Sequence, residues 1–111
     1  MLPPPVCFII TRTAAKAGVE GLALAAAASY ARFGVRVNCV APGLTRTEMT
    51  RSLTQNETVA KMSAAMHPLG RIGEPAEVAS AICWLLDAEQ SWVTGQVIGI
   101  DGGLGQVQAR S

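Results

Sequence analysis

Apolar and polar positions along the chain change from helical to strand-like spacing and back. Residues 13–32 are rich in alanine and leucine and contain no proline, so they predict a helix of about twenty residues. Gly34 predicts the end of this helix, because glycine adopts the left-handed conformation that often follows a last turn. Residues 35–40 are rich in valine and carry few charges, which predicts a buried strand. Pro42 and Gly43 end that strand, because proline cannot continue a ladder of hydrogen bonds.

The second half of the chain predicts more helix and one more strand. Residues 44–66 space their larger apolar side chains with polar ones, which predicts one or two amphipathic helices; these apolar residues are Met49, Leu53, Val59, Met62 and Met66. Such helices are either ordinary surface helices or a mobile cover over a site. A helix is predicted from Pro75, with a core-facing stripe formed by Val78, Ala81, Ile82, Leu85 and Leu86. Residues 96–103 predict a short buried strand followed by a glycine turn.

This order of helices and strands is typical of an α/β fold with a parallel sheet. Ligands of such folds bind beyond the carboxyl ends of the strands. The 111 residues fit one domain, and a hydrophobic share of 50% excludes a disordered chain. The net charge is only +1, and the basic residues are scattered along the chain. We therefore expect no nucleic-acid partner.

We expect no membrane association. The apolar start is interrupted by prolines 3 to 5, and the apolar stretch 17–30 contains Glu20 and is too short to span a bilayer. The three cysteines each lie among apolar neighbours, which predicts small buried thiols in a cytoplasmic compartment; they are Cys7, Cys39 and Cys83. The only histidine, His67, is predicted to be structural, and no metal site is predicted.

Several motifs, taken together, resemble the C-terminal half of the short-chain dehydrogenase/reductase family. They are AAKAGVEG, VRVNCVAPGLTRTEM, HPLGRIGEPAEVASAICWLLD and SWVTGQVIGIDGG, and the resemblance runs from about Thr13 to Gly105. It implies the C-terminal half of a Rossmann-type, doubly wound parallel sheet, with two clear strands plus helices. We therefore expect a non-family lead-in at 1–12, a partial NAD(P)-binding domain at 13–105 and a polar tail at 106–111.

The resemblance also implies the chemistry at Lys16. In the family, a Tyr-x-x-x-Lys pair lies on one helix face, where the lysine ammonium favours the ionised tyrosine and binds the nicotinamide ribose. Lys16 matches the lysine, whereas Arg12 stands at the position of the tyrosine. A guanidinium stays protonated and cannot exchange the proton. The only tyrosine, Tyr30, lies about four helical turns beyond Lys16.

The segment PGLTRT matches the P-G-x-x-x-T pattern that contacts NAD or NADP in the family. The implied cofactor-binding positions, besides Lys16, are Pro42, Gly43, Leu44, Thr45 and Thr47. We expect Gly43 to allow close approach of its backbone to the cofactor. Asn38 resembles the asparagine that precedes this turn, and we expect it to be structural. Residues 101–103 match the closing D-G-G of the family.

The implied function is that of an NAD(P)-dependent oxidoreductase, which transfers hydride between the cofactor and a small alcohol or carbonyl substrate. We expect this chain to be inactive by itself, because residue 12 is arginine and the early residues hold no glycine-rich phosphate-binding turn. Two alternatives stay open: a non-catalytic protein that binds a second copy or a full-length family member, and a truncated gene-model fragment. The sequence leaves the substrate and the choice between NAD and NADP open.

Overall fold

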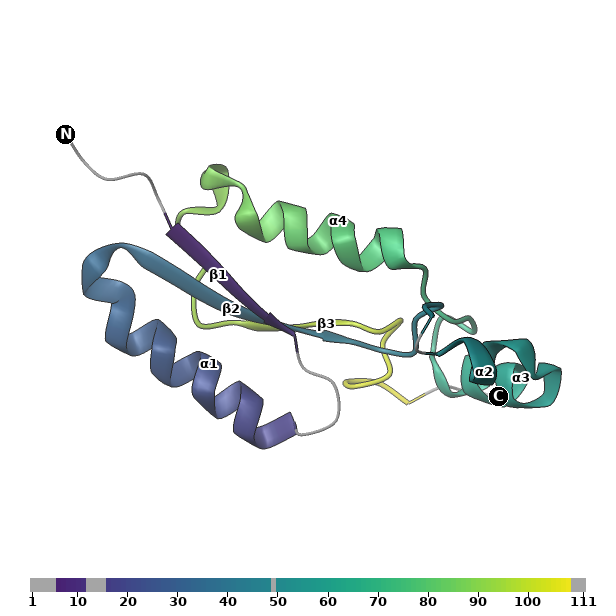
Figure 1. Cartoon of the computed structure of the whole chain (residues 1–111). Coiled ribbons are helices and arrows are strands. Elements are labelled where there is room, and N and C mark those ends of the chain that lie inside the picture. Colours follow the sequence, from purple (N-terminus) through teal and green to yellow (C-terminus); the bar gives the residue numbers. More distant parts are fainter. Residues whose placement is uncertain (1–5, 12–15, 49, 109–111) are drawn as a thin grey trace. The chain divides into compact units, whose positions relative to one another are not determined.

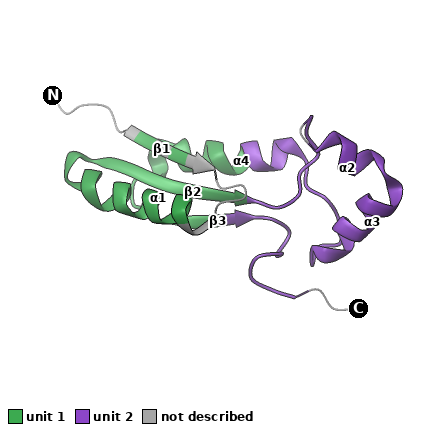
Figure 2. Ribbon diagram, turned by 60° about the horizontal axis from the view of Figure 1, so that its bottom comes forward, with its two compact units in different colours: residues 1–41, 80–98 green, residues 42–79, 99–111 purple. Residues whose placement is uncertain are grey.

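Figure 1 shows a computed structural model of the chain, in which residues 6–11, 16–48 and 50–108 are described. Strands and helices follow one another in the order β1 (Val6–Thr11), α1 (Lys16–Tyr30), η1 (Ala31–Phe33), β2 (Val35–Pro42), α2 (Arg51–Gln55), α3 (Glu57–Met66), α4 (Pro75–Leu86), η2 (Ala88–Gln90) and β3 (Val97–Ile100). The chain divides into two compact units (Figure 2). The first comprises residues 1–41 and 80–98, and the second comprises residues 42–79 and 99–111.

The described strands form one sheet in the order β1-β2-β3. β1 and β2 are parallel, and their register runs from Val6 opposite Val35 to Thr11 opposite Val40. Backbone hydrogen bonds join β2 to the segment leading into β3, with the Gly95 N–H 2.8 Å from the Val37 oxygen. The expected α/β fold is confirmed. β1 adds a third strand, in the segment for which the sequence predicts no resemblance to the family.

In the first unit, α1 covers one side of the sheet, and the part of α4 that belongs to this unit covers the other (Figure 1). The predicted helix is confirmed, as is its end at Gly34, which has a φ of 75° and donates its N–H to the Ala31 oxygen. Ala23 and Ala27 are buried. A Cβ at Gly95 would lie 3.7 Å from the Ala27 Cβ, so these small residues allow the helix to pack closely against the chain before β3.

Two polar side chains of β2 are buried and bonded inside the first unit. Arg36 is 7% exposed and donates to the carbonyl oxygens of Leu85, Asp87 and Val93, at 2.8, 3.3 and 3.1 Å. The Leu85 oxygen lies in the last turn of α4, where carbonyls lack partners within the helix. Asp87 follows the helix, and its oxygen also accepts the Gln90 N–H at 2.9 Å. Asn38 donates to the Val93 oxygen and accepts from the Gln96 N–H, both at 3.1 Å. The structural role expected for Asn38 is confirmed.

Some predictions about burial are wrong. Among the cysteines, only Cys39 is buried, while Cys7 is half-buried and Cys83 is exposed on the outer face of α4. Leu86, predicted in the core-facing stripe, is exposed. β3 alternates exposed and half-buried positions instead of being buried throughout. The alternation follows because successive side chains of a strand point to opposite faces of the sheet.

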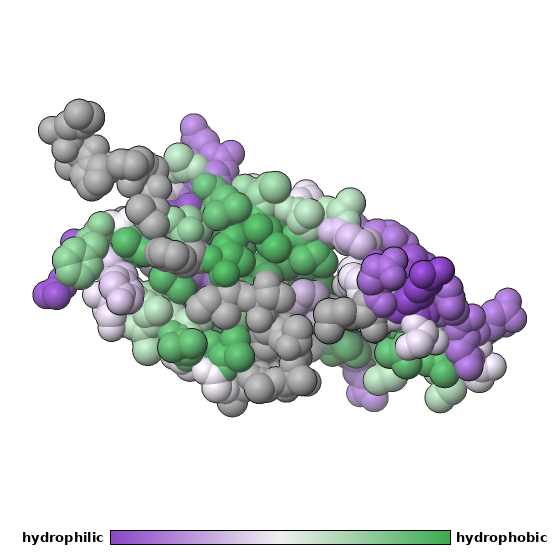
Figure 3. Space-filling model, in the orientation of Figure 1, coloured by the Kyte–Doolittle hydropathy of each residue, from purple (hydrophilic) through white to green (hydrophobic). Residues whose placement is uncertain are grey.

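In the second unit, the amphipathic stretch forms two short helices, α2 and α3, as predicted. The Asn56 side chain begins α3 by accepting the Val59 N–H at 3.1 Å. No described residue of either helix is buried, and Leu53, Met62 and Met66 are exposed. Met49 lies outside the described residues. Hydrophilic residues predominate around these helices on the face in Figure 3. No helix in the described parts of the chain is long and apolar enough to cross a bilayer.

Candidate functional site

The loop after β2, residues 43–47, is the part of the predicted site that the structure describes in full. The Gly43 N–H donates to the Ile100 oxygen at 3.1 Å. One residue further, the Leu44 oxygen accepts the Gly73 N–H and the Gly73 oxygen accepts the Arg46 N–H, both at 2.9 Å. Thr45 and Gly73 therefore form a short parallel bridge beyond the end of the sheet. The loop is braced on both sides by the chain of its own unit.

Gly43 is required by packing inside the protein. A Cβ at this position would lie 2.8 Å from Nε2 of His67 and 3.0 Å from the Asp101 Cα. Both distances are shorter than ordinary van der Waals contact, so any side chain would displace the ring or the backbone of Asp101. The sequence predicts that Gly43 serves close approach of a cofactor. The structure adds an internal reason, which holds whether or not a cofactor binds.

The two threonines of the loop differ in accessibility. Thr45 is buried, and its hydroxyl donates to the Gly43 oxygen at 3.1 Å. Thr47 is exposed. Its N–H donates to Oγ1 of Thr50 at 2.9 Å, and this hydroxyl in turn donates to the Thr45 oxygen at 2.5 Å. Thr50 thus fixes the backbone of the loop, and its own N–H donates to the hydroxyl of the exposed Thr47 at 3.3 Å.

Pro42 and Leu44, the other predicted contact positions, are half-buried. The N–H groups of Gly43 and Leu44 already have partners within the chain. The groups of this turn that a nicotinamide carboxamide could meet are its carbonyl oxygens, each of which has a second lone pair, and the hydroxyl of the exposed Thr47. A carboxamide has both donors and acceptors, so the chemistry of these groups fits it.

The predicted catalytic position lies in the other unit. Lys16 is the first residue of α1, and the structure does not describe its side chain. Arg12 lies outside the described residues. The interpretation of residues 12 and 16 as a broken catalytic pair therefore stays a prediction from the sequence. Among the predicted site residues, the structure groups only those of the loop from Pro42 to Thr47.

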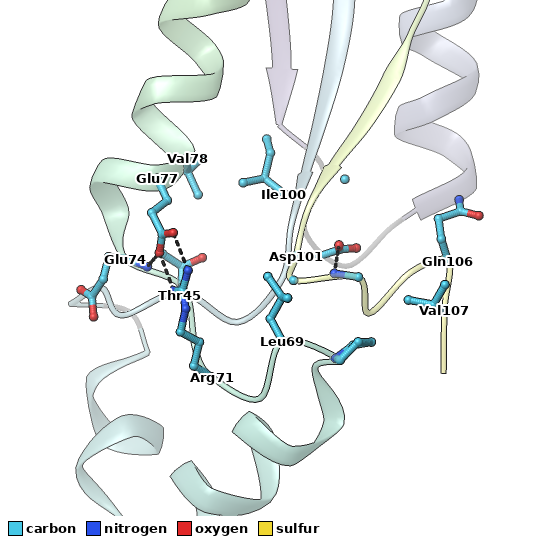
Figure 4. A pocket seen from close by; sticks show the side chains of 15 residues that line it. Thr45, Leu69, Arg71, Glu74, Glu77, Val78, Ile100, Asp101, Gln106 and Val107 are labelled. Atoms are coloured by element: carbon cyan, nitrogen blue, oxygen red, sulfur yellow. Dashed lines mark hydrogen bonds and ion pairs between the residues drawn. The ribbon is translucent and has the colours of Figure 1, made fainter. Parts of the chain in front are cut away.

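A surface pocket of about 610 Å³ lies beside the loop in the second unit (Figure 4). Its wall is mostly apolar, with Leu69, Val78, Ile100 and Val107 among the lining residues. An ion pair between Arg71 and Glu77 adds charge to this wall, with two N–O distances of 2.7 Å. The sequence did not predict this pair. Arg71 lies in a loop, so its distance from a residue of α4 does not follow from helical spacing.

Glu77 also completes the beginning of α4. Its Oε1 accepts the Glu74 N–H at 3.0 Å, which satisfies a backbone group that has no partner within the helix. The hydrogen bonds from Arg71, followed by the one from the Glu74 backbone, lower the pKa of Glu77 to about 2. Glu74 in turn accepts a hydrogen bond from Nε of Arg46 at 3.1 Å, which connects the start of α4 to the loop after β2.

Residues 101–103 end β3 as the family resemblance suggested. The Asp101 carboxylate accepts the N–H groups of Gly103 and Gly105, both at 3.0 Å. Gly102 and Gly103 have φ values of 60° and 94°, which favour glycine. The turn at the D-G-G motif is thus stabilised by its own residues, because the Asp101 carboxylate accepts hydrogen bonds from backbone N–H groups of that turn.

Comparison with known proteins places this arrangement in a family. The family model described as enoyl-(acyl carrier protein) reductase matches residues 11–105. A solved structure of a short-chain type dehydrogenase/reductase from Mycobacterium ulcerans is 30% identical, with a TM-score of 0.86 over 96% of this chain and 44% of its own. The chain therefore belongs to the short-chain dehydrogenase/reductase family, a family of oxidoreductases, and the sequence-based prediction is confirmed.

Two curated relatives give the level of similarity. The 3-oxoacyl-[acyl-carrier-protein] reductase FabG of Thermotoga maritima is 50% identical over 91 residues, which are 82% of this chain. Carbonyl reductase family member 4 of Danio rerio is 47% identical over 92 residues, or 83% of the chain. The chain spans 36% of the length of each of these relatives. A solved structure described as ElxO with NADP bound is 31% identical, with a TM-score of 0.73 over 80% of this chain and 36% of its own.

Proposed function

We propose that residues 13–105 act as the nicotinamide-contacting half of an NAD(P)-dependent oxidoreductase domain, between a lead-in at 1–12 and a tail at 106–111. The braced loop beyond the carboxyl end of β2 carries this proposal, because ligands of Rossmann-type sheets bind at that edge. The NADP bound to ElxO supports the class of cofactor. When bound, the cofactor would give or accept the hydride, and a small alcohol or carbonyl compound would be the substrate.

In this proposal, the loop residues orient the nicotinamide and do not react. Pro42, Gly43, Leu44 and Thr45 offer backbone groups to the carboxamide, and Thr47 offers an exposed hydroxyl. Lys16 binds the ribose hydroxyls. A fixed loop favours binding, because little conformational entropy is lost when the ligand arrives.

Binding of the nicotinamide end can be tested apart from catalysis. Reduced nicotinamide mononucleotide should shift the amide NMR signals of residues 43–47 in the 111-residue chain, whereas adenosine diphosphate should not. The substitution Thr47→Val should weaken this binding about fivefold, as expected for one hydrogen bond. Thr58→Val, on the exposed surface of α3, is the matched control and should bind as the wild type does. Equal shifts with both ligands, or none with either, would contradict the proposal.

We further propose that this chain by itself does not transfer hydride, because Arg12 cannot exchange the proton that a tyrosine exchanges in the family. Purified chain should oxidise NADH or NADPH with a panel of carbonyl compounds no faster than its Lys16→Ala variant. A rate clearly above that of the variant would refute this part of the proposal and leave the binding experiment unaffected.

A second function, assembly with another protein, is favoured by the surface of α1. Leu22 and Leu24 on this helix are 64% and 48% exposed, and Phe33 just after it is 60% exposed. Large apolar side chains that stay exposed are candidates for contact with a partner. We propose a second copy or a full-length family member as the partner. Sedimentation equilibrium should show association that Leu22→Lys weakens and Lys61→Ala, on α3, does not; a wild-type monomer at all concentrations would contradict it.

A further inference from the structure

We infer that His67 is a positioning residue, which in its neutral form with the proton on Nδ1 fixes the turn at Gly43 and Leu44 to the last turn of α3. Its ring lies between the loop that we assign to the nicotinamide and the helix that the sequence suggested as a cover. The inference about the loop geometry comes from contacts within the second unit, and its consequence for cofactor binding rests on the proposed function.

The first observation is that both ring nitrogens of His67 have backbone partners. Nε2 lies 3.2 Å from the Leu44 nitrogen, and Nδ1 lies 2.7 Å from the Ser63 oxygen. The side chain is buried, with 4% of the residue exposed. A backbone N–H can only donate and a carbonyl can only accept. Nε2 must therefore present its lone pair to Leu44, and Nδ1 must carry the proton that points to Ser63.

The second observation is that His67 completes the end of α3. The Ser63 carbonyl belongs to the last turn of this helix, where carbonyl groups lack partners within the helix. The backbone N–H of His67 donates to the Ala64 oxygen of the same turn at 3.1 Å. One residue therefore closes the helix with its backbone and its Nδ1, and holds the loop with its Nε2.

The third observation is that two turns of the second unit approach His67 closely. A Cβ on Gly43 would lie 2.8 Å from Nε2, so the glycine is what allows the ring to reach Leu44. A Cβ on Gly102 would lie 3.6 Å from the His67 Cβ, which places the turn after β3 against the same residue. Packing as well as hydrogen bonds therefore holds His67 in place.

A protonated ring, or the other neutral tautomer, does not fit this arrangement. Either form would direct an N–H at the N–H of Leu44, and the contact would become repulsive. The side chain that best replaces the acceptor is glutamine, whose carbonyl oxygen can take the place of Nε2. Phenylalanine keeps the ring and its volume but offers no acceptor, so the pair His67→Gln and His67→Phe separates hydrogen bonding from packing.

The test uses the whole 111-residue chain. Long-range nitrogen–proton NMR spectra of the wild type should show the tautomer with the proton on Nδ1. Hydrogen exchange of the Leu44 amide should be at least about tenfold faster in His67→Phe and close to the wild-type rate in His67→Gln. The Gly95 amide, bonded to Val37 in the first unit, reports overall stability and should keep its rate in both variants.

The binding readout separates the two proposals. Reduced nicotinamide mononucleotide should bind His67→Phe at least about fivefold more weakly, with recovery in His67→Gln. The opposite tautomer in the wild type, or a Leu44 amide unaffected by His67→Phe, would overturn the inference. Lack of binding by the wild type, with the expected tautomer and exchange rates, would refute the proposed function and uphold the role of His67 in the loop. If His67→Phe does not fold, the wild-type tautomer and His67→Gln decide.

Discussion

Strand β2 and helix α3 use polar and apolar residues in opposite ways. Every residue of β2 from Arg36 to Ala41 is buried, including a charged and an amide side chain. In α3 no described residue is buried, and Met62 and Met66 are 65% and 63% exposed. Residue type alone would place the arginine outside and the methionines inside. The difference teaches that polarity alone does not decide burial: hydrogen-bond partners allow Arg36 and Asn38 to be buried, and a methionine is buried only where other segments cover it.

The largest effect on this comparison should come from Arg36→Ala. The substitution removes hydrogen bonds to three carbonyl groups. The Leu85 oxygen loses its closest donor, whereas the Val93 oxygen keeps the Asn38 amide at 3.1 Å. We expect a loss of about 2–4 kcal/mol in the free energy of unfolding, measured by urea denaturation.

Arg51→Ala is the matched control for this prediction. Arg51 lies on α2 with an exposed side chain, at 3.8 Å from a Glu48 oxygen. Its loss should cost less than about 0.5 kcal/mol. If the two alanine variants were equally stable, the buried contacts of Arg36 would contribute nothing, and the contrast between β2 and the helices would fail. Should Arg36→Ala not fold, Arg36→Lys provides a milder change that keeps the charge.

A smaller effect is expected from the ion pair of Arg71 and Glu77. Its side chains are more exposed than those of β2, but they form hydrogen bonds that the methionines of α3 lack. The hydrogen bonds from Arg71 lower the pKa of Glu77 to about 2, so the folded state favours the ionised carboxylate. Its contribution to stability is present above the ordinary carboxyl pKa and is lost as the pH falls toward 2. The melting temperature of the wild type should therefore fall more steeply on acidification than that of Glu77→Gln.

Glu89→Gln is the control for this pH dependence. Glu89 is an exposed carboxylate in η2. Its replacement should leave the fall of the melting temperature on acidification as steep as in the wild type. If the melting temperatures of the wild type and Glu77→Gln fell equally with pH, the exposed pair of Arg71 and Glu77 would not be maintained in solution.

The smallest effect should come from α3. Replacing both Met62 and Met66 by glutamine should change the free energy of unfolding by less than about 0.5 kcal/mol, because both side chains are exposed. Val37→Ala, in the buried part of β2, should cost about 1–2 kcal/mol in the same assay. A loss in the methionine variant as large as that of Val37→Ala would show that α3 is covered in solution.

The fold follows from local signals in most places. The alanine-rich helix, its end at Gly34, the valine-rich strand and the helix from Pro75 all occur as predicted. Each depends on propensity, spacing or a terminating residue, and these act over a few neighbouring positions. Exposure of Cys83 and Leu86 was not predicted, because it depends on which face of α4 the sheet covers.

The candidate site divides in the same way. The motif P-G-x-x-x-T identified the loop after β2, but the bracing by Gly73, by Thr50 and by His67 could not be read from spacing. These partners lie between 3 and 29 residues from the loop atoms they contact, so only the folded chain brings them together. His67 was predicted to be structural, and the structure places its ring between the loop and the last turn of α3.

By itself, the sequence determined the family, the order of the elements after β1, the position of the loop and the prediction that Arg12 stands in the place of a tyrosine. All four depend on residue identity at fixed spacing along one chain. Only the tertiary structure decided that Arg36 is buried, that Gly43 makes room for His67, and that the methionines of α3 are exposed. These properties depend on atoms from distant segments meeting in space, because burial and hydrogen bonding are set by neighbours in the fold and not by neighbours in the chain.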